Sequence, residues 1–584
     1  MNQPLLPPGN PSPPPQPKNK PITLNHASTQ RSPAQRILIA LLSSIGLLAL
    51  VVLVAPQLFY PLGFDQAVYA ACAYAIKNGG VPIRDCFETK QMGIMLMYAL
   101  PMRFTLSPIA IHAFTLIWTA LTAIILGHIT TKLFDARAGL IAAVLYWLIY
   151  AGINYWSMDQ AETFSNLFLV LAFWLLWKEI GDWRLEIGDW SNRQSPIANL
   201  FLAGVCIGIT VWFKYVFGLI GVVLGACLLL HIVVVRLGDP AALSVVKTLI
   251  THSAAYAAGV LLIIALGLGY YALQTGGLNS LTQQLSFLRA NFPLAEPKPW
   301  PQMAQLLLRF LNNGADLTAD FKATVPQQLI FGGGFPLIFV LAFIGLLRFM
   351  RTQAMLVITL LAYFAVGVFI VAWQGNYIQY HFTIIWPPLV LLAAAALAEK
   401  EGQGAREIRG FSLSPHLLIS LPLSCATIVL LTLRLLPWLQ DAYTNVIVQH
   451  KTPMQLYGES NQSALLPAAA YIQQHTQPNE SIAIFGDAPW LYVLADRPNA
   501  TRFSFINVWI KKHGSTHYQL MVQQYLDGLQ QNQPTYIVLT KENYPWQNND
   551  YLQDYKMATP IYNYIESNYR YEAEVGPFLM FKRK

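Results

Sequence analysis

The sequence contains little charge. Of its 584 residues only 11% are Asp, Glu, Lys or Arg, whereas 55% are hydrophobic, and the mean hydropathy is +0.42. A chain with so little polar surface cannot be an ordinary soluble protein. The formal net charge of +8 would suggest nucleic-acid binding in a soluble chain. In a membrane protein the positions of Lys and Arg matter more than their sum. We therefore predict a polytopic membrane protein that does not bind nucleic acid.

Cysteine is scarce as well. Five cysteines are too few for a disulfide framework, and Cys206, Cys227 and Cys425 fall within apolar runs, where a thiol behaves as a small hydrophobic group. Cys72 and Cys86 share one polar loop and could pair if that loop faces an oxidising compartment, but we expect free thiols. The sequence shows no clear metal site and no glycine-rich phosphate-binding loop. We therefore expect no nucleotide and no other cofactor, while the sequence does not decide whether the protein depends on a metal.

The first 34 residues lack the apolar content needed to fold. They are rich in Pro, Asn, Gln and Ser, with a proline-rich run at 11–17, and are predicted to form a disordered cytoplasmic tail. The apolar run at 36–58 begins too late and is too long for a standard cleaved signal peptide. We expect it to remain as the first membrane span.

Long apolar runs dominate the middle of the chain. A membrane-spanning helix needs roughly 20 apolar residues, and about eleven segments approach this length. They lie near 36–58, 109–131, 138–155, 161–177, 197–214, 216–235, 250–273, 329–347, 354–372, 382–398 and 415–437. The shorter runs at 94–106 and 464–472 are expected to be interfacial or soluble helices. The predicted fold is mainly α, a transmembrane helical bundle at 35–437.

The distribution of Lys and Arg predicts the orientation of these spans. With the N-terminus inside, every inner segment carries at least two such residues, whereas the short outer connections 156–160 and 373–381 carry none. Cytoplasmic loops carry this kind of excess, so an odd number of spans and an external C-terminus follow. The first outer loop, 59–107, is the exception. It contains four cations: Lys77, Arg84, Lys90 and Arg103.

Two further segments lie outside the predicted bundle. Residues 274–328 form a second long outer loop, and the polar, aromatic residues 438–584 read as a small external α/β domain. Within that domain we expect strands at 481–485 and 535–539, a helix at 519–531 and mostly helix at 551–569. It contains no nucleophile elbow.

The first outer loop is predicted to contain a short surface helix. Apolar residues from Val68 to Ile76 recur at helical spacing, and Asn78-Gly79-Gly80 supplies a helix stop. Asp65, directly before this helix, could be its N-cap or a solvated loop carboxylate. Its place beside a span end, among other ionisable groups near lipid, also favours a functional role.

A second acidic cluster lies at the start of the fourth expected span, on the same outer side. Asp159 could be a helix cap, whereas Glu162 would be costly there without a partner or water, because the helix that follows is otherwise apolar. Lys214 lies at the same boundary, where it could only snorkel. Tyr380 and His381 precede the tenth span and could belong to an interfacial belt. Together these residues predict a polar cavity at the outer face.

Several motifs occur in order along the chain. They are Gly63-Phe64-Asp65, Gly80 to Gly93 with Glu88-Thr89-Lys90, Met97-Tyr98-Ala99-Leu100, Ala161-Glu162-Thr163-Phe164, Tyr380-His381-Phe382 with Pro387-Pro388, and Ile484 to Pro498. Their order and common sidedness resemble the integral-membrane GT-C glycosyltransferases, most of all the protein O-mannosyltransferase and aminoarabinose transferase group. The chain departs from that family where Lys90-Gln91-Met92 stands in place of Lys-Pro-Pro. It also offers both Asp159 and Glu162 at the second acidic position.

The resemblance implies transfer of a sugar from a polyprenyl-phosphate donor to a protein, glycan or lipid acceptor on the outer face of the plasma membrane, with inversion. Asp65 would be the base that takes the acceptor proton, and Lys90 would stabilise the departing phosphate. The further candidates share the same outer side. They are Glu162, Asp159 and Glu88 for catalysis, and Arg84, Lys214, Arg103, Tyr380 and His381 for substrate binding.

Other classes of protein share some of these features. A secondary transporter or lipid flippase also has many spans and a few charges at membrane level, but transporters commonly show paired repeats with interrupted helices at the midplane. We find no convincing repeat, and the charges here lie at one face. A third interpretation is a sensor or interaction protein that binds its partner through the external domain.

Overall fold

The computed structural model describes residues 33–153, 155–181, 196–236, 242–291, 334–375, 378–398, 415–458, 460, 462–512, 515–541 and 550–584. Nearly all of the predicted disordered tail and most of the second outer loop lie outside these residues. The chain forms two compact units, Met1–Val51 and Val52–Lys584. Helix α1 (Pro33–Val54) is apolar, and the second unit contains the cavity described below.

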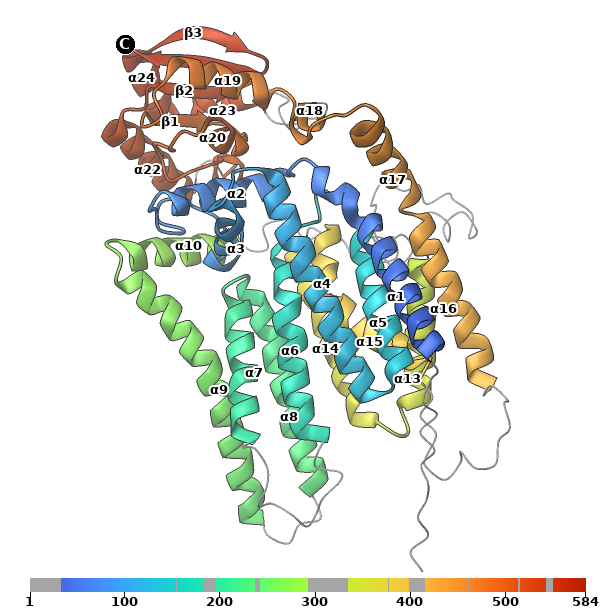
Figure 1. The fold of residues 1–584 in the computed structure, drawn as a ribbon. Coiled ribbons are helices and arrows are strands. Elements are labelled where there is room, and N and C mark those ends of the chain that lie inside the picture. Colours follow the sequence, from blue (N-terminus) through green and yellow to red (C-terminus); the bar gives the residue numbers. More distant parts are fainter. Residues whose placement is uncertain are drawn as a thin grey trace, which may run out of the picture. The chain divides into compact units, whose positions relative to one another are not determined.

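The second unit is mainly helical, and each segment expected to span the membrane contains a helix (Figure 1). Apart from α1, these helices are α4 (Pro108–Leu133), α5 (Ala136–Ala151), α6 (Ala161–Gly181), α7 (Pro196–Val211), α8 (Gly218–Arg236), α9 (Ala242–Ala272), α13 (Phe335–Phe349), α14 (Ala354–Gln374), α15 (Trp386–Ala395) and α16 (Pro415–Leu433). The 3₁₀ turns η3 (Tyr215–Phe217) and η4 (Gln379–Ile385) precede α8 and α15.

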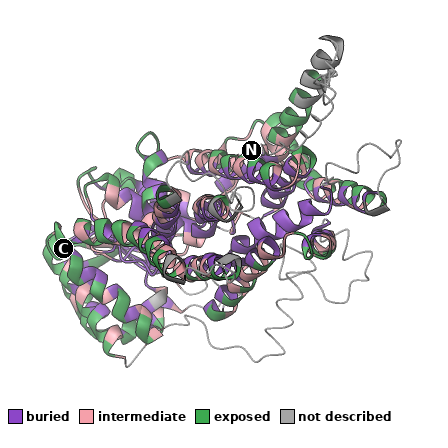
Figure 2. Ribbon diagram, turned by 90° about the horizontal axis from the view of Figure 1, so that it is seen from below, coloured by how far each residue is buried: buried purple, intermediate pink, exposed green. Residues whose placement is uncertain are grey.

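Five helices among the described residues are long and apolar enough to cross a membrane, or six if one bent helix pair counts as a single span. Many large apolar side chains on these helices are exposed, among them Ile117, Leu266 and Phe369. Figure 2 shows exposed residues along the outer sides of helices and buried residues between them. Lipid covers such surfaces, so the chain is a multi-pass membrane protein. The total of eleven spans stays a prediction.

The first outer loop folds as two short helices joined by an irregular segment, as predicted. Helix α2 (Phe64–Lys77) follows η1 (Ala55–Phe59). The chain turns after α2 at Gly79, whose φ of +89° is favourable only for glycine, and α3 (Met92–Met102) comes next. The expectation of free thiols in this loop was wrong. Cys72 of α2 and Cys86 of the irregular segment form a disulfide. The pairing depends on the turn at Gly79, which folds the segment back along α2.

Helix α9 continues into α10 (Gly277–Asn291), the described part of the second outer loop. In α10 the buried residues Gly277, Ser280, Leu281, Gln284 and Phe287 recur at helical spacing along one face. The helix is therefore amphipathic. Figure 1 shows α10 beside α2 and α3.

The C-terminal region is an α/β structure, as expected. A connecting stretch contains α17 (Leu436–Ala442), the π-helical η5 (Tyr443–Val448), α18 (Pro453–Gly458) and α19 (Leu465–His475). The sheet order is β1-β2-β4-β3, with β1 (Ile482–Phe485) parallel to β2 (Tyr536–Thr540) and the hairpin of β3 (Tyr569–Val575) and β4 (Phe578–Arg583) antiparallel. Its helices are α20 (Trp490–Ala495), α21 (Asn507–Ile510), α22 (Thr516–Asn532), α23 (Tyr551–Met557) and α24 (Thr559–Asn568). Both predicted strands and the predicted helices are confirmed, whereas the β3–β4 hairpin was not anticipated.

The C-terminal region shares its hydrophobic core with the outer loops. Phe87 of the first loop and Phe287 of α10 are buried in the same cluster as Phe503 and Trp509. The backbone N–H of Phe87 donates to the carbonyl of Arg502 at 2.6 Å. The α/β region therefore packs directly against the residues that surround the candidate site.

Candidate active site

Asp65 stands at the start of α2, where the helix dipole favours a negative charge. The N-cap of α2 is Gly63, so Asp65 is not the cap that the sequence allowed for. Its Oδ2 accepts a hydrogen bond from the Tyr380 hydroxyl at 2.7 Å and lies 3.5 Å from Lys90 Nζ. The carboxylate is held from two sides and remains 30% exposed.

Lys90 lies in the irregular segment before α3, and its side chain is only 13% exposed. Nζ also lies 4.8 Å from the centre of the Tyr69 ring, a cation–π distance. Burial acts to lower the pKa of Lys90, but the negative charges of Asp65, Glu88 and Glu162 outweigh it, so the pKa is raised above its ordinary value. Lys90 is therefore a stable cation at neutral pH.

Glu88 is buried two residues before Lys90. Its Oε1 accepts hydrogen bonds from the Thr89 hydroxyl at 2.8 Å and from the Lys90 backbone N–H at 3.2 Å. Burial raises the pKa of Glu88, and the nearby charge of Lys90 opposes this only in part. Glu88 therefore fixes the backbone beside Lys90 through these hydrogen bonds, and its negative charge also stabilises the Lys90 cation.

A second lysine and a second carboxylate form the floor of the site. Lys214 Nζ lies 2.5 Å from Glu162 Oε1, at the start of α6, and 3.0 Å from Gln374 Oε1, at the end of α14. Glu162 Oε2 is buried and has no hydrogen-bond partner within the described chain. Gly93 permits a close approach here, because a Cβ atom would lie 2.6 Å from the carbonyl oxygen of Trp212. The Lys90 segment can therefore pack beside Lys214.

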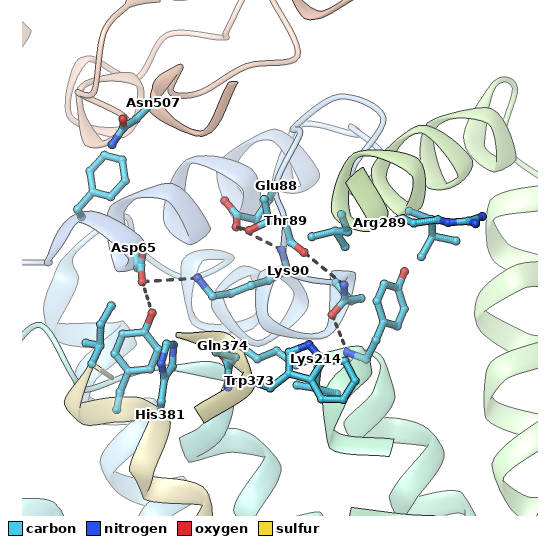
Figure 3. Close-up of a pocket in the computed structure, with 18 of the residues that line it drawn as sticks. Asp65, Glu88, Thr89, Lys90, Lys214, Arg289, Trp373, Gln374, His381 and Asn507 are labelled. Atoms are coloured by element: carbon cyan, nitrogen blue, oxygen red, sulfur yellow. Dashed lines mark hydrogen bonds and ion pairs between the residues drawn. The ribbon is translucent and has the colours of Figure 1, made fainter. Parts of the chain in front are cut away.

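Asp65, Glu88, Lys90, Lys214 and Gln374 line a cavity of about 730 Å³. Figure 3 shows Asp65 and Lys90 directed toward each other, with Lys214, Gln374 and His381 on the other side of the cavity. The apolar part of the lining comes from α2, η3, α8, α10, α14, the residue before η4 and the C-terminal region. It consists of Phe64, Val216, Leu219, Leu285, Leu288, Trp373, Ile378 and Phe505. A polar cluster thus faces an apolar wall, the composition expected for an amphiphilic ligand.

The C-terminal region forms one rim of the cavity. Asn507, Lys511 and Lys512 line it, and Lys511 Nζ pairs with Asp554 Oδ2 at 2.8 Å. The position of Asn507 in this rim depends on a buried carboxylate, that of Asp487.

Asp487 supports that rim from inside the α/β region. It accepts hydrogen bonds from the Tyr551 hydroxyl and, at 3.2 Å, from the Asn507 backbone N–H. Burial raises the pKa of Asp487 to about 6. The side chain does not line the cavity.

The structure separates the two acidic candidates of the fourth span. Asp159 is fully buried, with Oδ2 2.7 Å from His112 Nδ1, and does not line the cavity. His112 Nε2 lies 3.0 Å from the carbonyl oxygen of Tyr60. Glu162, in contrast, contacts the cavity through Lys214. The observed partner of each carboxylate is a basic side chain, His112 for Asp159 and Lys214 for Glu162, rather than a backbone N–H at the start of α6.

Two cations of the first loop lie away from the cavity. Arg84 forms an ion pair with its neighbour Asp85 at 2.6 Å, and Arg103 is exposed at the C-terminal end of α3. Burial acts to raise the pKa of Asp85, but hydrogen bonds from Arg84 and Val81 hold it below its ordinary value. The structure therefore brings together Asp65, Glu88, Lys90, Lys214, Glu162, Tyr380 and His381, but not Arg84, Arg103 or Asp159.

Sequence reasoning missed several residues of this region. His112 could have been found, because it is an ionisable residue within an apolar run. The same feature identified Glu162 as a candidate. Gln374 is the last residue of α14, but an amide at a helix end carries no such signal. Arg289 lies in α10, and Asn507 and Lys511 lie at the two ends of α21; the sequence does not reveal that these helices border the cavity. The described residues contain no group of three or more His, Cys, Asp or Glu side chains arranged to hold a metal ion.

The helical bundle, helices α2 and α3 and the α/β region are arranged as in a solved membrane protein, so the fold implied by the resemblance in the sequence is confirmed. ArnT from Cupriavidus metallidurans, bound to undecaprenyl phosphate, aligns with a TM-score of 0.54 over 93% of this chain and 98% of that one, at 12% sequence identity. Its apo structure aligns with a TM-score of 0.53 over 94% and 98%, also at 12% identity.

The oligosaccharyltransferase AglB from Archaeoglobus fulgidus, in complex with an inhibitory peptide and a dolichol-phosphate, aligns less well. The TM-score is 0.46 over 92% of this chain and 74% of that one, at 14% identity. No protein-family model matches the sequence, and no curated protein matches it. At 12% identity, the similarity to ArnT establishes the fold of this chain and nothing further about it.

Proposed function

We propose that the protein is a membrane glycosyltransferase that moves a sugar from a polyprenyl-phosphate donor to an acceptor hydroxyl on the outer face of the membrane, with inversion. The observation that carries this proposal is the contact between Asp65 and Lys90 at a cavity with an apolar wall. A base and a cation side by side are what such a transfer needs. The ArnT-like fold, seen in a protein solved with undecaprenyl phosphate, supports the proposed donor.

Asp65 is the proposed general base. A single displacement forms a bond between the acceptor oxygen and the anomeric carbon, breaks the bond from that carbon to the phosphate oxygen, and transfers the acceptor proton to Asp65. A carboxylate within hydrogen-bond reach of the acceptor can take this proton. The Tyr380 hydroxyl and Lys90 fix one oxygen of Asp65, which leaves the other oxygen for the acceptor.

Lys90 is the proposed ligand of the departing phosphate. The phosphodiester becomes a phosphomonoester, so negative charge grows on oxygen, and a fixed cation near that oxygen lowers the barrier. The raised pKa of Lys90 keeps this cation charged through neutral pH. Lys214 stands behind it, already paired with Glu162, and together with His381 it is proposed to contact the sugar or the phosphate.

The apolar wall is the proposed site of the polyprenyl chain. Leu285 of α10 and Trp373 of α14 line the cavity and are both exposed, 44% and 48% respectively. A lipid tail can therefore pass from the bilayer to the polar cluster along side chains that already face outward.

The proposed topology has eleven spans, a cytoplasmic N-terminus and an external α/β domain. Disulfides persist in oxidising compartments, so the Cys72–Cys86 bond supports an outer location for the first loop. The absence of Lys and Arg from the short outer connections supports the same orientation. The boundaries proposed from the sequence, 35–437 and 438–584, define the membrane and external domains.

One experiment separates the proposed enzyme from a transporter or flippase. The purified protein is incubated with a panel of polyprenyl-phosphate sugars and candidate acceptors, and the same protein in proteoliposomes is tested for uptake of these lipids or sugars. We expect a glycosylated acceptor and no uptake. Uptake or lipid translocation without a glycosylated product would contradict the proposal.

A further inference from the structure

The segment that carries Lys90 is buried but belongs to no helix or strand. Residues 87–91 run between the disulfide at Cys86 and the start of α3 without a partner strand. Buried backbone carbonyls that lack secondary structure need hydrogen-bond donors from elsewhere. In this segment the donors are side-chain amides.

Gln284 of α10 supplies two of these hydrogen bonds. Its Nε2 donates to the carbonyl oxygen of Glu88 at 2.6 Å and to that of Lys90 at 3.0 Å. Because carbonyl oxygens can only accept, these two contacts fix the nitrogen end of the amide toward the segment. The Tyr215 hydroxyl donates to Gln284 Oε1 at 3.3 Å. Gln284 is completely buried, so both amide protons are committed to the Lys90 segment.

The two carbonyls lie on either side of Thr89. A donor that binds both at once fixes the backbone of this residue and therefore the point from which the Lys90 side chain extends. The carbonyl between them, that of Thr89, accepts from Gln91 Nε2 at 3.3 Å. Two glutamines thus donate to three consecutive carbonyls. Gln91 belongs to the same segment, whereas Gln284 comes from α10 and links the segment to a distant part of the chain.

The neighbouring glutamine of α10 faces another part of the molecule. Gln283 Oε1 accepts from Arg502 Nη1 at 2.8 Å and from Gln524 Nε2 at 3.0 Å, both in the C-terminal region. Adjacent residues of one helix therefore make two separate attachments. One attachment holds the Lys90 segment, and the other holds the α/β region.

We propose that Gln284 is a positioning residue for Lys90, acting through the backbone carbonyls of Glu88 and Lys90 to hold the lysine where it binds the phosphate of a polyprenyl phosphate. This inference rests on the proposed function. Without the amide, two buried carbonyls lose their donor, and the segment must shift to satisfy them. Such a shift moves Lys90 Nζ away from the phosphate.

The test is the affinity of the purified, full-length protein for undecaprenyl phosphate in detergent, measured for a set of variants. Gln284→Met removes the amide and keeps the length of the side chain, and we expect Kd to rise about tenfold. The matched control Gln283→Met, one residue away on the same helix, should change Kd by less than about twofold. Gln284→Asn keeps an amide but withdraws it by one methylene, so it serves as the milder variant if Gln284→Met does not fold.

A double-mutant cycle with Lys90→Ala distinguishes positioning from a general structural effect. If Gln284 acts through Lys90, Gln284→Met should raise Kd little further in the Lys90→Ala background. An equal tenfold loss in both backgrounds, or a Gln284→Met protein with wild-type Kd, would overturn the inference. Failure of the wild-type protein to bind undecaprenyl phosphate at all would overturn the proposed function itself.

Discussion

Two carboxylates near the ends of helices each contact a basic side chain, in very different surroundings. Asp65 and Lys90 are 30% and 13% exposed and line a cavity, whereas Asp159 and His112 are both completely buried. The first pair, Asp65 and Lys90, is here called the open pair, and Asp65 has an oxygen available to a ligand. The second, Asp159 and His112, is called the enclosed pair and contacts only protein.

Hydrogen bonding accounts for the difference. Both ring nitrogens of His112 face oxygen acceptors, Asp159 Oδ2 and the carbonyl of Tyr60, so the ring has no free polar atom. Asp159 also adopts a left-handed backbone conformation, with φ of +55°. Such a network holds α4, α6 and the end of η1 together. We interpret the open pair as chemical and the enclosed pair as structural, and the following predictions test that distinction.

The largest expected effect is on catalysis at the open pair. Asp65→Asn removes the proposed base without changing the size of the side chain, and we expect transfer to fall by about 10³-fold. The melting temperature should stay close to that of the wild type. Transfer rates and thermal unfolding of the same detergent-solubilised preparation check both parts, and near-normal transfer would remove Asp65 from the proposed role.

The enclosed pair should show the opposite pattern. Asp159→Ala leaves His112 with a buried, unpaired nitrogen, and we expect a loss of about 3 kcal/mol in the free energy of unfolding. The partly exposed pair Arg84–Asp85 provides a control, since Asp85→Ala should cost less than about 1 kcal/mol. Denaturant or thermal unfolding measures both. Equal stability of the Asp159→Ala protein and the wild type would end the structural interpretation.

Asp487 is another buried carboxylate, and within the described parts of the chain no ion pair with a basic side chain is found for it. Its pKa of about 6 is raised above that of the unfolded chain, so the neutral form stabilises the fold. This contribution is fully present below about pH 4 and is lost as the pH rises through about 6. Asp487→Asn should remove that pH dependence and stabilise the α/β region at neutral pH by up to about 3 kcal/mol. Unfolding curves from pH 4 to 8 that keep the wild-type slope would contradict this.

The smallest expected effect concerns donor binding. Lys90→Ala should raise the KM for the lipid-linked donor by about 10-fold to 100-fold, because a charge-assisted contact to phosphate is lost. Arg103, a cation of the same loop that lies away from the cavity, supplies the comparison: Arg103→Ala should keep the wild-type KM. Donor saturation curves measure both. Unchanged saturation in the Lys90→Ala protein would exclude it from the phosphate site.

The sequence predicted most helices and the polar residues of the cavity because both depend on local signals. Apolar runs predict helices, and charges beside them predicted Asp65, Lys90 and Glu162. The choice between Asp159 and Glu162 could not be made from the sequence, because they lie three residues apart. Their partners come from distant parts of the chain, His112 from α4 and Lys214 from the connection between α7 and η3.

Other features depend on long-range contacts that leave no local signal. The β3–β4 hairpin is polar and aromatic and lacks a clear alternation. The Cys72–Cys86 bond requires the turn at Gly79 to fold the loop back. Gln284 looks like any polar residue of an amphipathic helix, and only the fold shows that it is buried against the Lys90 segment.

The central claim is a transfer that cleaves the bond between a sugar and a polyprenyl phosphate. Phosphorus-31 NMR follows this bond directly, because a phosphodiester and a phosphomonoester give distinct resonances. With the wild-type protein, a suitable polyprenyl-phosphate sugar and an acceptor, the account predicts that the diester signal decays as the monoester signal grows and the glycosylated acceptor appears. A diester signal that persists across the whole donor and acceptor panel, while the lipid or the sugar is moved across proteoliposomes, would contradict it.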